Sequence, residues 1–350
     1  MGKNKLTTSK IIIENYPHQR GIHCETGSIK NMLKFYGHDI SETMIFGIGS
    51  GFDFMHFPFR FFNGNEIPIF RSIFVQVFRK FSKRMGIDGH ISFFINKKRS
   101  MKAIDALLKQ NIPVGLVSEV SRLPFFPLRD RQFSGHHFVV FGKDSNDEYI
   151  VGDTDPHFPD DSAQRISYED LMNARFTKDL LSPRGAMFYI KSTPDHFDIK
   201  KGILEGIKNT CHQMLGIPLP YFGVKGIYYL SNRIKNYTKI YGEKQAWRNI
   251  RFQIFISEEG GSGGSGFRYL YANFLKEAAE YLNDHELMTI SLSMREIADQ
   301  WQQFALEANR QCEERKEKNI VYLANMIHCC AQMEEKLFKE LKKWTITKLK

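Results

Sequence analysis

The first helical pattern in the chain lies between residues 24 and 36. Its apolar side chains recur three and four residues apart and so share one helix face: Ile29, Met32, Leu33 and Tyr36. Gly37 is a natural stop, because glycine readily adopts the left-handed conformation that follows a helix end. The pattern predicts an amphipathic helix that begins at Cys24.

Residues 101–175 mix helical and strand patterns. MKAIDALLKQ, at 101–110, predicts a helix, and the VGLVSEV that follows it predicts a strand. Within residues 135–153, the apolar runs HHFVVFG and YIVGD flank the polar turn KDSNDE, which is typical of a β-hairpin. Ser167 can cap a further helix that begins YEDLMNAR. This part of the chain therefore reads as α+β.

From about residue 195 the chain becomes helical in character. Three long segments show helical periodicity: residues 267–282, 286–315 and 318–348. We therefore predict two domains, an α+β domain over residues 1–195 and a mainly helical domain over residues 196–350.

The segment GGSGGSG, at residues 260–266, interrupts the helical half. Such composition is typical of a flexible connector, but a tight turn that leads into the next helix would look the same. A glycine-rich turn at a helix start can also bind an anion such as phosphate, with Arg268 as its charge partner. The residues alone leave these three interpretations open.

Charge and cysteine content narrow the class of protein. The net charge of +10 suggests an acidic partner, although the basic residues are dispersed except in the C-terminal KLFKELKKWTITKLK, which can also be a solvated helix face. We find no nucleic-acid motif, no apolar run long enough to span a membrane and no secretory signal, so we expect a cytoplasmic protein. The five cysteines are widely spaced without a CxxC pair, so we expect neither a disulfide framework nor a metal site.

Cys24 is the strongest candidate for chemistry. The first turn of a helix stabilises a thiolate, which is the nucleophilic form of cysteine. A cysteine nucleophile needs a base and a group that orients the base. The predicted hairpin offers both, because histidines open its first strand and Asp153 and Asp155 end the returning strand.

Neighbouring side chains on a strand point to opposite faces, so we expect only one of His136 and His137 to face Cys24. We favour His137 as the base and Asp153 as the orienting acid. Asp155 remains an alternative, because it lies two residues further on and can share the face of Asp153.

Four segments together resemble a known family. HCETGSIKNMLKFYG, ISETMIFGIGSGFDF, GHHFVVFG and VGDTDP are similar to the N-terminal domain of butirosin biosynthesis protein H, and GGSGGSGFRYLYANFLKEAAEYL resembles the helical domain that commonly follows it. The resemblance implies a papain-like fold, similar to that of double-glycine leader peptidases. It matches Cys24 to the nucleophile, His137 to the base and Asp153 to the orienting acid.

The same resemblance leaves the oxyanion donor open. A papain-like site places a glutamine six residues before the cysteine, but His18 occupies that position here and Gln19 follows it. The backbone N–H of Cys24 is a further candidate.

The family's namesake transfers an acyl group from an acyl carrier protein to an amine, in antibiotic biosynthesis. The resemblance thus implies an acyltransferase with an acidic carrier protein and a small-molecule amine as partners. It needs no cofactor of its own, because the carrier supplies the phosphopantetheine arm, whose phosphate could contact Gly263, Gly264 and Arg268. A hydrolase that uses the same residues, and a binding protein without catalysis, are the alternatives. The sequence makes no prediction of oligomeric state.

Overall fold

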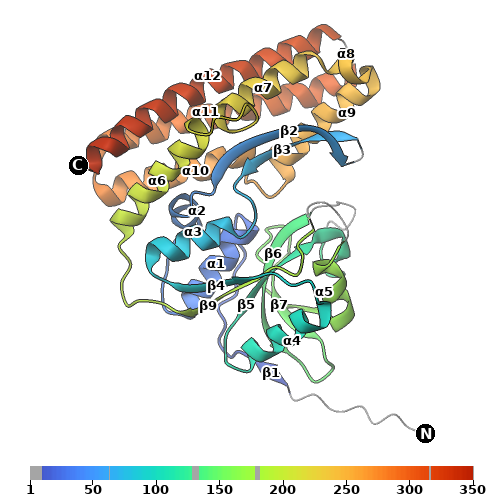
Figure 1. Cartoon of the computed structure of the whole chain (residues 1–350), viewed down its shortest axis with the longest axis vertical. Helices are drawn as coiled ribbons and strands as arrows, with labels where there is room; N and C mark the ends of the chain where they lie inside the picture. Colours follow the sequence, from blue (N-terminus) through green and yellow to red (C-terminus); the bar gives the residue numbers. More distant parts are fainter. Residues whose placement is uncertain (1–9, 63, 128–133, 178–181, 315–316, 350) are drawn as a thin grey trace. The chain divides into compact units, whose positions relative to one another are not determined.

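Figure 1 shows the chain as a computed structural model, which describes residues 10–62, 64–127, 134–177, 182–314 and 317–349. The chain divides into two compact units. Unit 1 comprises residues 1–45 and 74–197, and unit 2 comprises residues 46–73 and 198–350. The sequence assigned all residues up to 195 to one domain, whereas in the structure residues 46–73 belong to the second unit.

Unit 1 is built on an antiparallel sheet. Among the described residues the neighbouring strands are β4 (Asp88–Ser92), β9 (Met187–Ser192), β5 (Val114–Glu119), β6 (Ser134–Lys143), β7 (Tyr149–Gly152) and β8 (Gln164–Ile166), and the short β1 (Ile11–Ile12) also pairs with β6. β5, β6 and β7 are fully buried, which explains their nearly continuous apolar sequences. The predicted strand at 114 and the predicted hairpin are confirmed.

Helices pack on the two faces of this sheet. They form two pairs: α1 (Cys24–Phe35) with α3 (Gln76–Met85), and α4 (Lys97–Leu108) with α5 (Tyr168–Arg175). Phe188 of β9 contacts Phe78 of α3, whereas its neighbour Met187 faces the α4 side. Because adjacent side chains on a strand alternate, the two pairs lie on opposite sides of the sheet, as Figure 1 shows.

Unit 2 combines a hairpin with helices. The hairpin consists of β2 (Phe52–Phe62) and β3 (Asn65–Arg71). The helices are α6 (Ile199–Leu215), α7 (Gly223–Lys235), α8 (Tyr237–Tyr241), α9 (Glu243–Ile254), α10 (Arg268–Leu282), α11 (His285–Glu314) and α12 (Glu317–Lys348). The short α2 (Glu42–Ile48) is the segment of chain that leads from unit 1 into this hairpin. The predicted α+β class, with a mainly helical second part, is confirmed.

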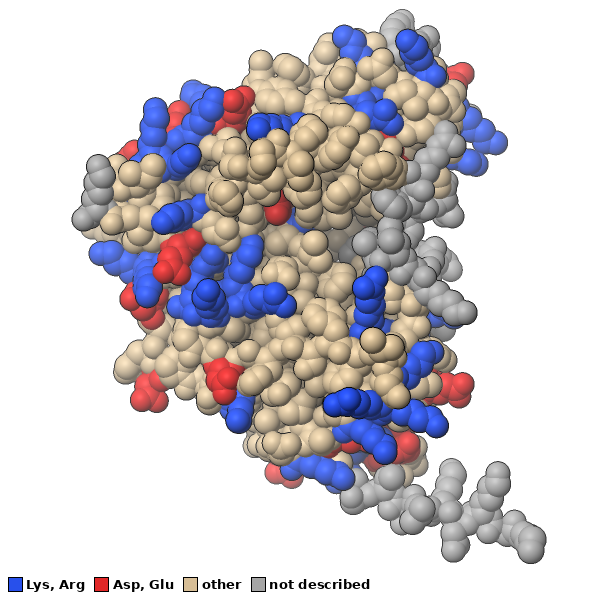
Figure 2. Space-filling view, in the orientation of Figure 1, with Lys and Arg blue, Asp and Glu red and all other residues tan. Residues whose placement is uncertain are grey.

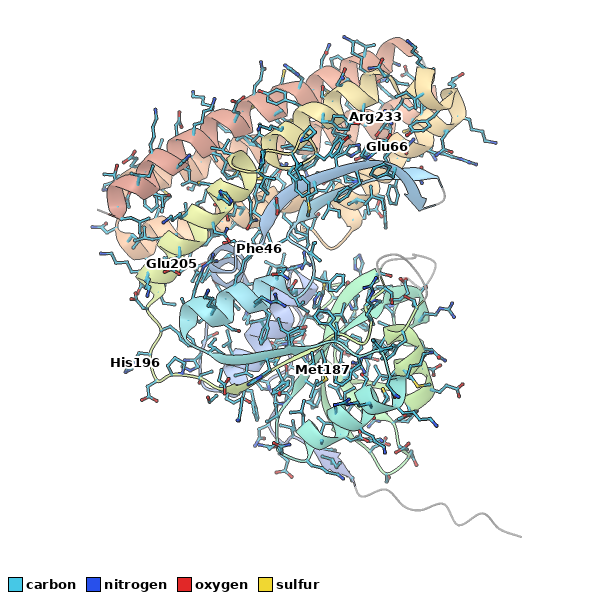
Figure 3. All side chains as sticks on the ribbon, in the orientation of Figure 1. Phe46, Glu66, Met187, His196, Glu205 and Arg233 are labelled. Carbon is cyan, nitrogen blue, oxygen red and sulfur yellow. The ribbon has the colours of Figure 1, made fainter. Side chains whose placement is uncertain are left out.

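A buried polar cluster holds the hairpin in unit 2. Glu66 of β3 is fully buried and accepts hydrogen bonds from His56, Arg233, Tyr237 and Tyr241. Figure 3 shows Glu66 and Arg233 side by side between β3 and α7. A buried carboxylate is tolerated only with such partners, so the cluster commits residues 46–73 to the helical unit.

Candidate functional site

Cys24 is the first residue of α1 and is half-buried. His23 caps the helix, and its side chain accepts a hydrogen bond from the backbone N–H of Thr26. The backbone N–H groups in the first turn of a helix have no partner within the helix, so they favour a negative charge at its head. The structure therefore leaves the Cys24 thiol accessible at a position that stabilises a thiolate.

Glu42 fixes the turn that precedes Cys24. Its buried carboxylate accepts hydrogen bonds of 3.1 Å from the backbone N–H groups of Ile22 and His23 and from the hydroxyl of Thr26. The close approach needs glycine at position 21, because a Cβ there would lie 2.5 Å from the carboxylate. The helix head is thus held by a residue from the start of α2.

Two histidines at the start of β6 lie beside Cys24. Sγ of Cys24 is 3.8 Å from Nδ1 of His137, and the thiol also interacts with the imidazole of His136. The expectation that only one of them could face Cys24 is wrong. The bulge at Gly135, which has a φ of 108°, lies before both histidines; they pair in regular register with Ser118 and Val117, so their side chains leave β6 on opposite faces.

Asp153 is the partner of His136. Its Oδ2 lies 2.6 Å from Nε2 of His136, and both side chains are buried. Burial alone would lower the pKa of His136, but the Asp153 carboxylate and the Cys24 thiol raise it well above its usual value. The pair therefore favours a protonated imidazole next to the thiol.

The sequence paired Asp153 with His137, and this pairing is corrected. In the β6–β7 register, Val139 faces Gly152 and Val140 faces Val151, which puts Asp153 on the side of His136. The alternative acid, Asp155, lies elsewhere: its carboxylate binds His157 at 2.7 Å, and its backbone N–H donates to Asp153.

His137 has its own carboxylate neighbour in Glu25. Nε2 of His137 is 3.8 Å from Oε2 of Glu25, and both residues are fully buried. Oε1 of Glu25 also accepts a hydrogen bond of 3.3 Å from the backbone N–H of Phe78 in α3. Two histidine–carboxylate pairs therefore flank Cys24.

The structure directs the Gln19 side chain away from the helix head and places His18 beside Gly152, which precedes Asp153. Gln19 is exposed and binds Lys34 through its side chain and Asn31 through its backbone carbonyl. Lys34 lies about 15 Å along α1 from Cys24, at about 1.5 Å per residue, so Gln19 is not the donor. His18 packs against Gly152. Burial lowers the pKa of its imidazole, although the carboxylates of Asp153 and Asp161 act to raise it.

The glycine-rich segment at residues 260–266 is a loop held by hydrogen bonds to Glu258 and not a phosphate site. The backbone N–H of Ser265 donates to both oxygens of Glu258, at 3.1 Å, so the protein's own carboxylate takes the place of an anion. Next to it, Gly263 and Gly264 adopt positive φ angles of 66° and 91°. The loop is a tight turn, which rules out the flexible connector.

Arg268 cannot serve as the charge partner of a phosphate. It is fully buried, its Nε donates to Glu334 at 2.7 Å, and its guanidinium lies 4.0 Å from the centre of the Trp301 ring. Its Nη1 donates to the carbonyl groups of Ser265 and Gly266. The expected contact with phosphopantetheine is therefore withdrawn for Gly263, Gly264 and Arg268.

Sequence reasoning missed Glu25 and Glu42. One signal was available for Glu25, since an acidic residue directly after Cys24 sits in the first turn, where it complements the helix dipole. Nothing in the order of residues links Glu42 to the Cys24 turn, because that contact spans 19 residues and depends on where α2 packs.

None of the helices in the described part of the chain is long and apolar enough to cross a membrane. Within the same residues, no three side chains of the metal-binding types gather closely enough to hold an ion.

Two family models match the chain. Residues 23–154 match the family model described as butirosin biosynthesis protein H, N-terminal, and residues 169–341 match a domain of unknown function, DUF4872. No curated protein matches the chain significantly. The first match contains Cys24, both histidines and Asp153. The chain therefore belongs to the proteins in which a butirosin biosynthesis protein H N-terminal domain is followed by a DUF4872 domain.

Proposed function

We propose that this protein is a cysteine-dependent acyltransferase that forms an amide. The observation that supports this most is the set Cys24, His136 and Asp153. A half-buried thiol at a helix head lies beside an imidazole whose pKa is raised, and a carboxylate 2.6 Å away orients that imidazole. This is the nucleophile, base and orienting acid that covalent acyl transfer requires.

In the first half-reaction, the Cys24 thiolate attacks the carbonyl carbon of an acyl thioester. The carbon–sulfur bond of the donor breaks, and the departing thiolate takes a proton from the His136 imidazolium. The acyl group is then a thioester on Cys24. Exchange between two thioesters changes the free energy little, so this step needs no separate energy source.

In the second half-reaction, an amine attacks the acyl-enzyme. His136, now neutral, accepts the proton of the amine, and the Cys24 thiolate leaves as the amide forms. For the negative oxygen of each tetrahedral intermediate, we propose the backbone N–H of Cys24 as a donor, since it lies at the open start of α1.

We assign the base to His136 rather than His137. The hydrogen bond from His136 to Asp153 is 2.6 Å, whereas His137 is 3.8 Å from both Cys24 and Glu25. The short charged hydrogen bond to Asp153 fixes the orientation of the His136 ring and keeps its proton available for transfer. The 3.8 Å distances of His137 are too long to orient its ring as firmly. His137 then positions the thiol without carrying the proton.

The family match suggests the donor and the acceptor. By analogy with the family's namesake, the donor is an acyl group on the phosphopantetheine arm of an acidic acyl carrier protein, and the acceptor is a small-molecule amine. The net charge of +10 supports an acidic partner, because opposite charges accelerate encounter.

The test is to incubate the protein with an acyl-carrier-protein thioester, with and without added amine. An acyltransferase consumes the thioester and produces the amide in proportion to the amine. Release of free acid at a rate that ignores the amine would instead identify a hydrolase. No consumption in either case, with Cys24 no more reactive than a free thiol, would indicate a binding protein without catalysis.

A further inference from the structure

Unit 2 contains a cavity that the proposed chemistry does not use. It measures about 500 Å³ and lies where α6, α7 and α12 meet. This volume falls in the usual range for a small-molecule site. Its lining combines apolar and basic side chains.

The floor of the cavity is apolar and buried. Met214 of α6 and Val224 of α7 are 1% and 3% exposed. Ile346 of α12 lies at the edge and remains 50% exposed. A hydrocarbon chain placed here would cover the exposed parts of Leu215 and Ile346, whose apolar surface now meets water.

The rim carries four lysines and one glutamate. Glu335 is engaged by Lys339 at 2.5 Å and by the hydroxyl of Tyr228 at 2.9 Å. The other three lysines, Lys225, Lys342 and Lys343, form no ion pair with any carboxylate in the described part of the chain. Figure 2 shows Lys and Arg side chains gathered over α6 and the part of α12 near the C-terminus.

We propose that this cavity binds a monomeric amphipathic anion, an aliphatic chain that ends in a carboxylate or a phosphate. The chain would lie along Leu215 and Ile346 above the buried floor, and the head group would meet Lys225, Lys342 and Lys343 of α7 and α12. The basic C-terminal segment seen in the sequence then acts as the charged wall of a ligand site. This site is separate from Cys24 and does not depend on the proposed acyl transfer.

The test is calorimetric titration of the full chain with decanoate, decyl phosphate, decanol and acetate. The two amphipathic anions should bind, decanol should bind at least about tenfold more weakly, which corresponds to about 1.4 kcal/mol, and acetate should not bind. Equal binding of decanol and decanoate would overturn the proposal. So would binding to vesicles that contain phosphatidylglycerol without binding to monomeric decanoate.

Variants locate the site. The double variant Lys342→Ala/Lys343→Ala changes only exposed side chains and should weaken decanoate about tenfold; Ile346→Ser should weaken it as well. Lys276→Ala is the matched control, because this lysine is equally exposed on α10 but lies outside the cavity. Unchanged binding in the double variant would contradict the proposal. Cys24→Ala should bind decanoate normally, so failure of the acyltransferase assignment would leave this result intact.

Discussion

At the scale of single residues, the two histidines beside Cys24 differ in how firmly they are held. His136 has a short hydrogen bond to a buried carboxylate, whereas His137 lies at 3.8 Å from Glu25. The ring that is oriented best is the one that can transfer a proton in a fixed direction. The carboxylate partners therefore distinguish the two histidines: Asp153 for His136 and Glu25 for His137.

Replacing each histidine by glutamine should separate their roles. We expect His136→Gln to slow acylation of Cys24 by about 10²–10⁴-fold, because it removes the proton donor. His137→Gln should have a much smaller effect, because it alters only packing around the thiol. Single-turnover kinetics with an acyl thioester measures both. The opposite order of effects would assign the base to His137.

Asp153→Asn tests the electrostatic part of the site. The carboxylate raises the pKa of His136 against the effect of burial, so its loss should lower that pKa. The thiol then has a cationic neighbour over a smaller range of pH. We expect an NMR titration of the His136 imidazole to show that this ring loses its proton at a lower pH in the variant than in the wild-type protein. Superimposable pH profiles for the two proteins would argue against the ion pair.

At the scale of elements, the most consequential feature is the β2–β3 hairpin, which belongs to unit 2. Glu66 connects it to α7 and α8 through Arg233, Tyr237 and Tyr241. Burial alone would raise the pKa of Glu66, but hydrogen bonds from His56, Arg233 and Tyr241 lower it to about 2. The carboxylate is therefore charged in the folded protein at every ordinary pH.

Glu66→Gln should destabilise unit 2 by about 3 kcal/mol, because it removes the charge of a fully buried carboxylate whose partner, Arg233, is itself only 21% exposed. Since folding lowers the pKa of Glu66, its contribution is complete above about pH 4.5 and declines as the pH falls toward 2. Denaturant unfolding followed by tryptophan fluorescence measures this, because Trp247, Trp301 and Trp344 all lie in unit 2.

The control for this experiment is Glu280→Gln, since Glu280 is 58% exposed on α10. It should change the free energy of unfolding by less than about 1 kcal/mol. If Glu66→Gln behaved like this control at neutral pH, the cluster would not be what holds the hairpin.

Elements with a regular apolar pattern were predicted from the sequence, whereas the β2–β3 hairpin was missed. The sequence predicted α1, the β6–β7 hairpin and the three long helices from α10 to α12. In each of them the spacing of apolar residues follows a single helix or strand period. β2 and β3 were missed, in part because Pro58 and Pro68 lie within them and proline argues against a strand.

The pairing of the candidate site residues could not be read from the sequence. Cys24, both histidines and Asp153 were identified, but the partner of Asp153 depends on the register of β6 and β7, in which Val139 faces Gly152. Similarly, composition could not show that Glu258 fills the glycine-rich turn, because that contact depends on packing in three dimensions.

At the scale of the whole molecule, net charge determines which kinds of partner the protein attracts. The chain has a net charge of +10, and an acidic carrier protein would be attracted over a range set by the ionic strength. A small neutral donor would gain nothing from this field.

Salt should therefore affect two kinds of donor differently. Raising the salt concentration from about 0.05 M to 0.5 M, which shortens the screening length several-fold, should slow acylation by a carrier-bound thioester. Acylation by a free pantetheine thioester should change little. Comparing kcat/KM for the two donors tests this. Equal slowing of both reactions would mean that salt acts on the site and not on the encounter.

In the proposed reaction Cys24 carries the acyl group. Mass spectrometry of the peptide that contains Cys24 tests this directly, after the protein is mixed with an acyl-carrier-protein thioester and no amine. We expect this peptide to gain the mass of the acyl group, His136→Gln to slow the gain greatly, and added amine to remove it. An unmodified Cys24 peptide in a protein that still consumes the thioester would show that Cys24 does not carry the acyl group.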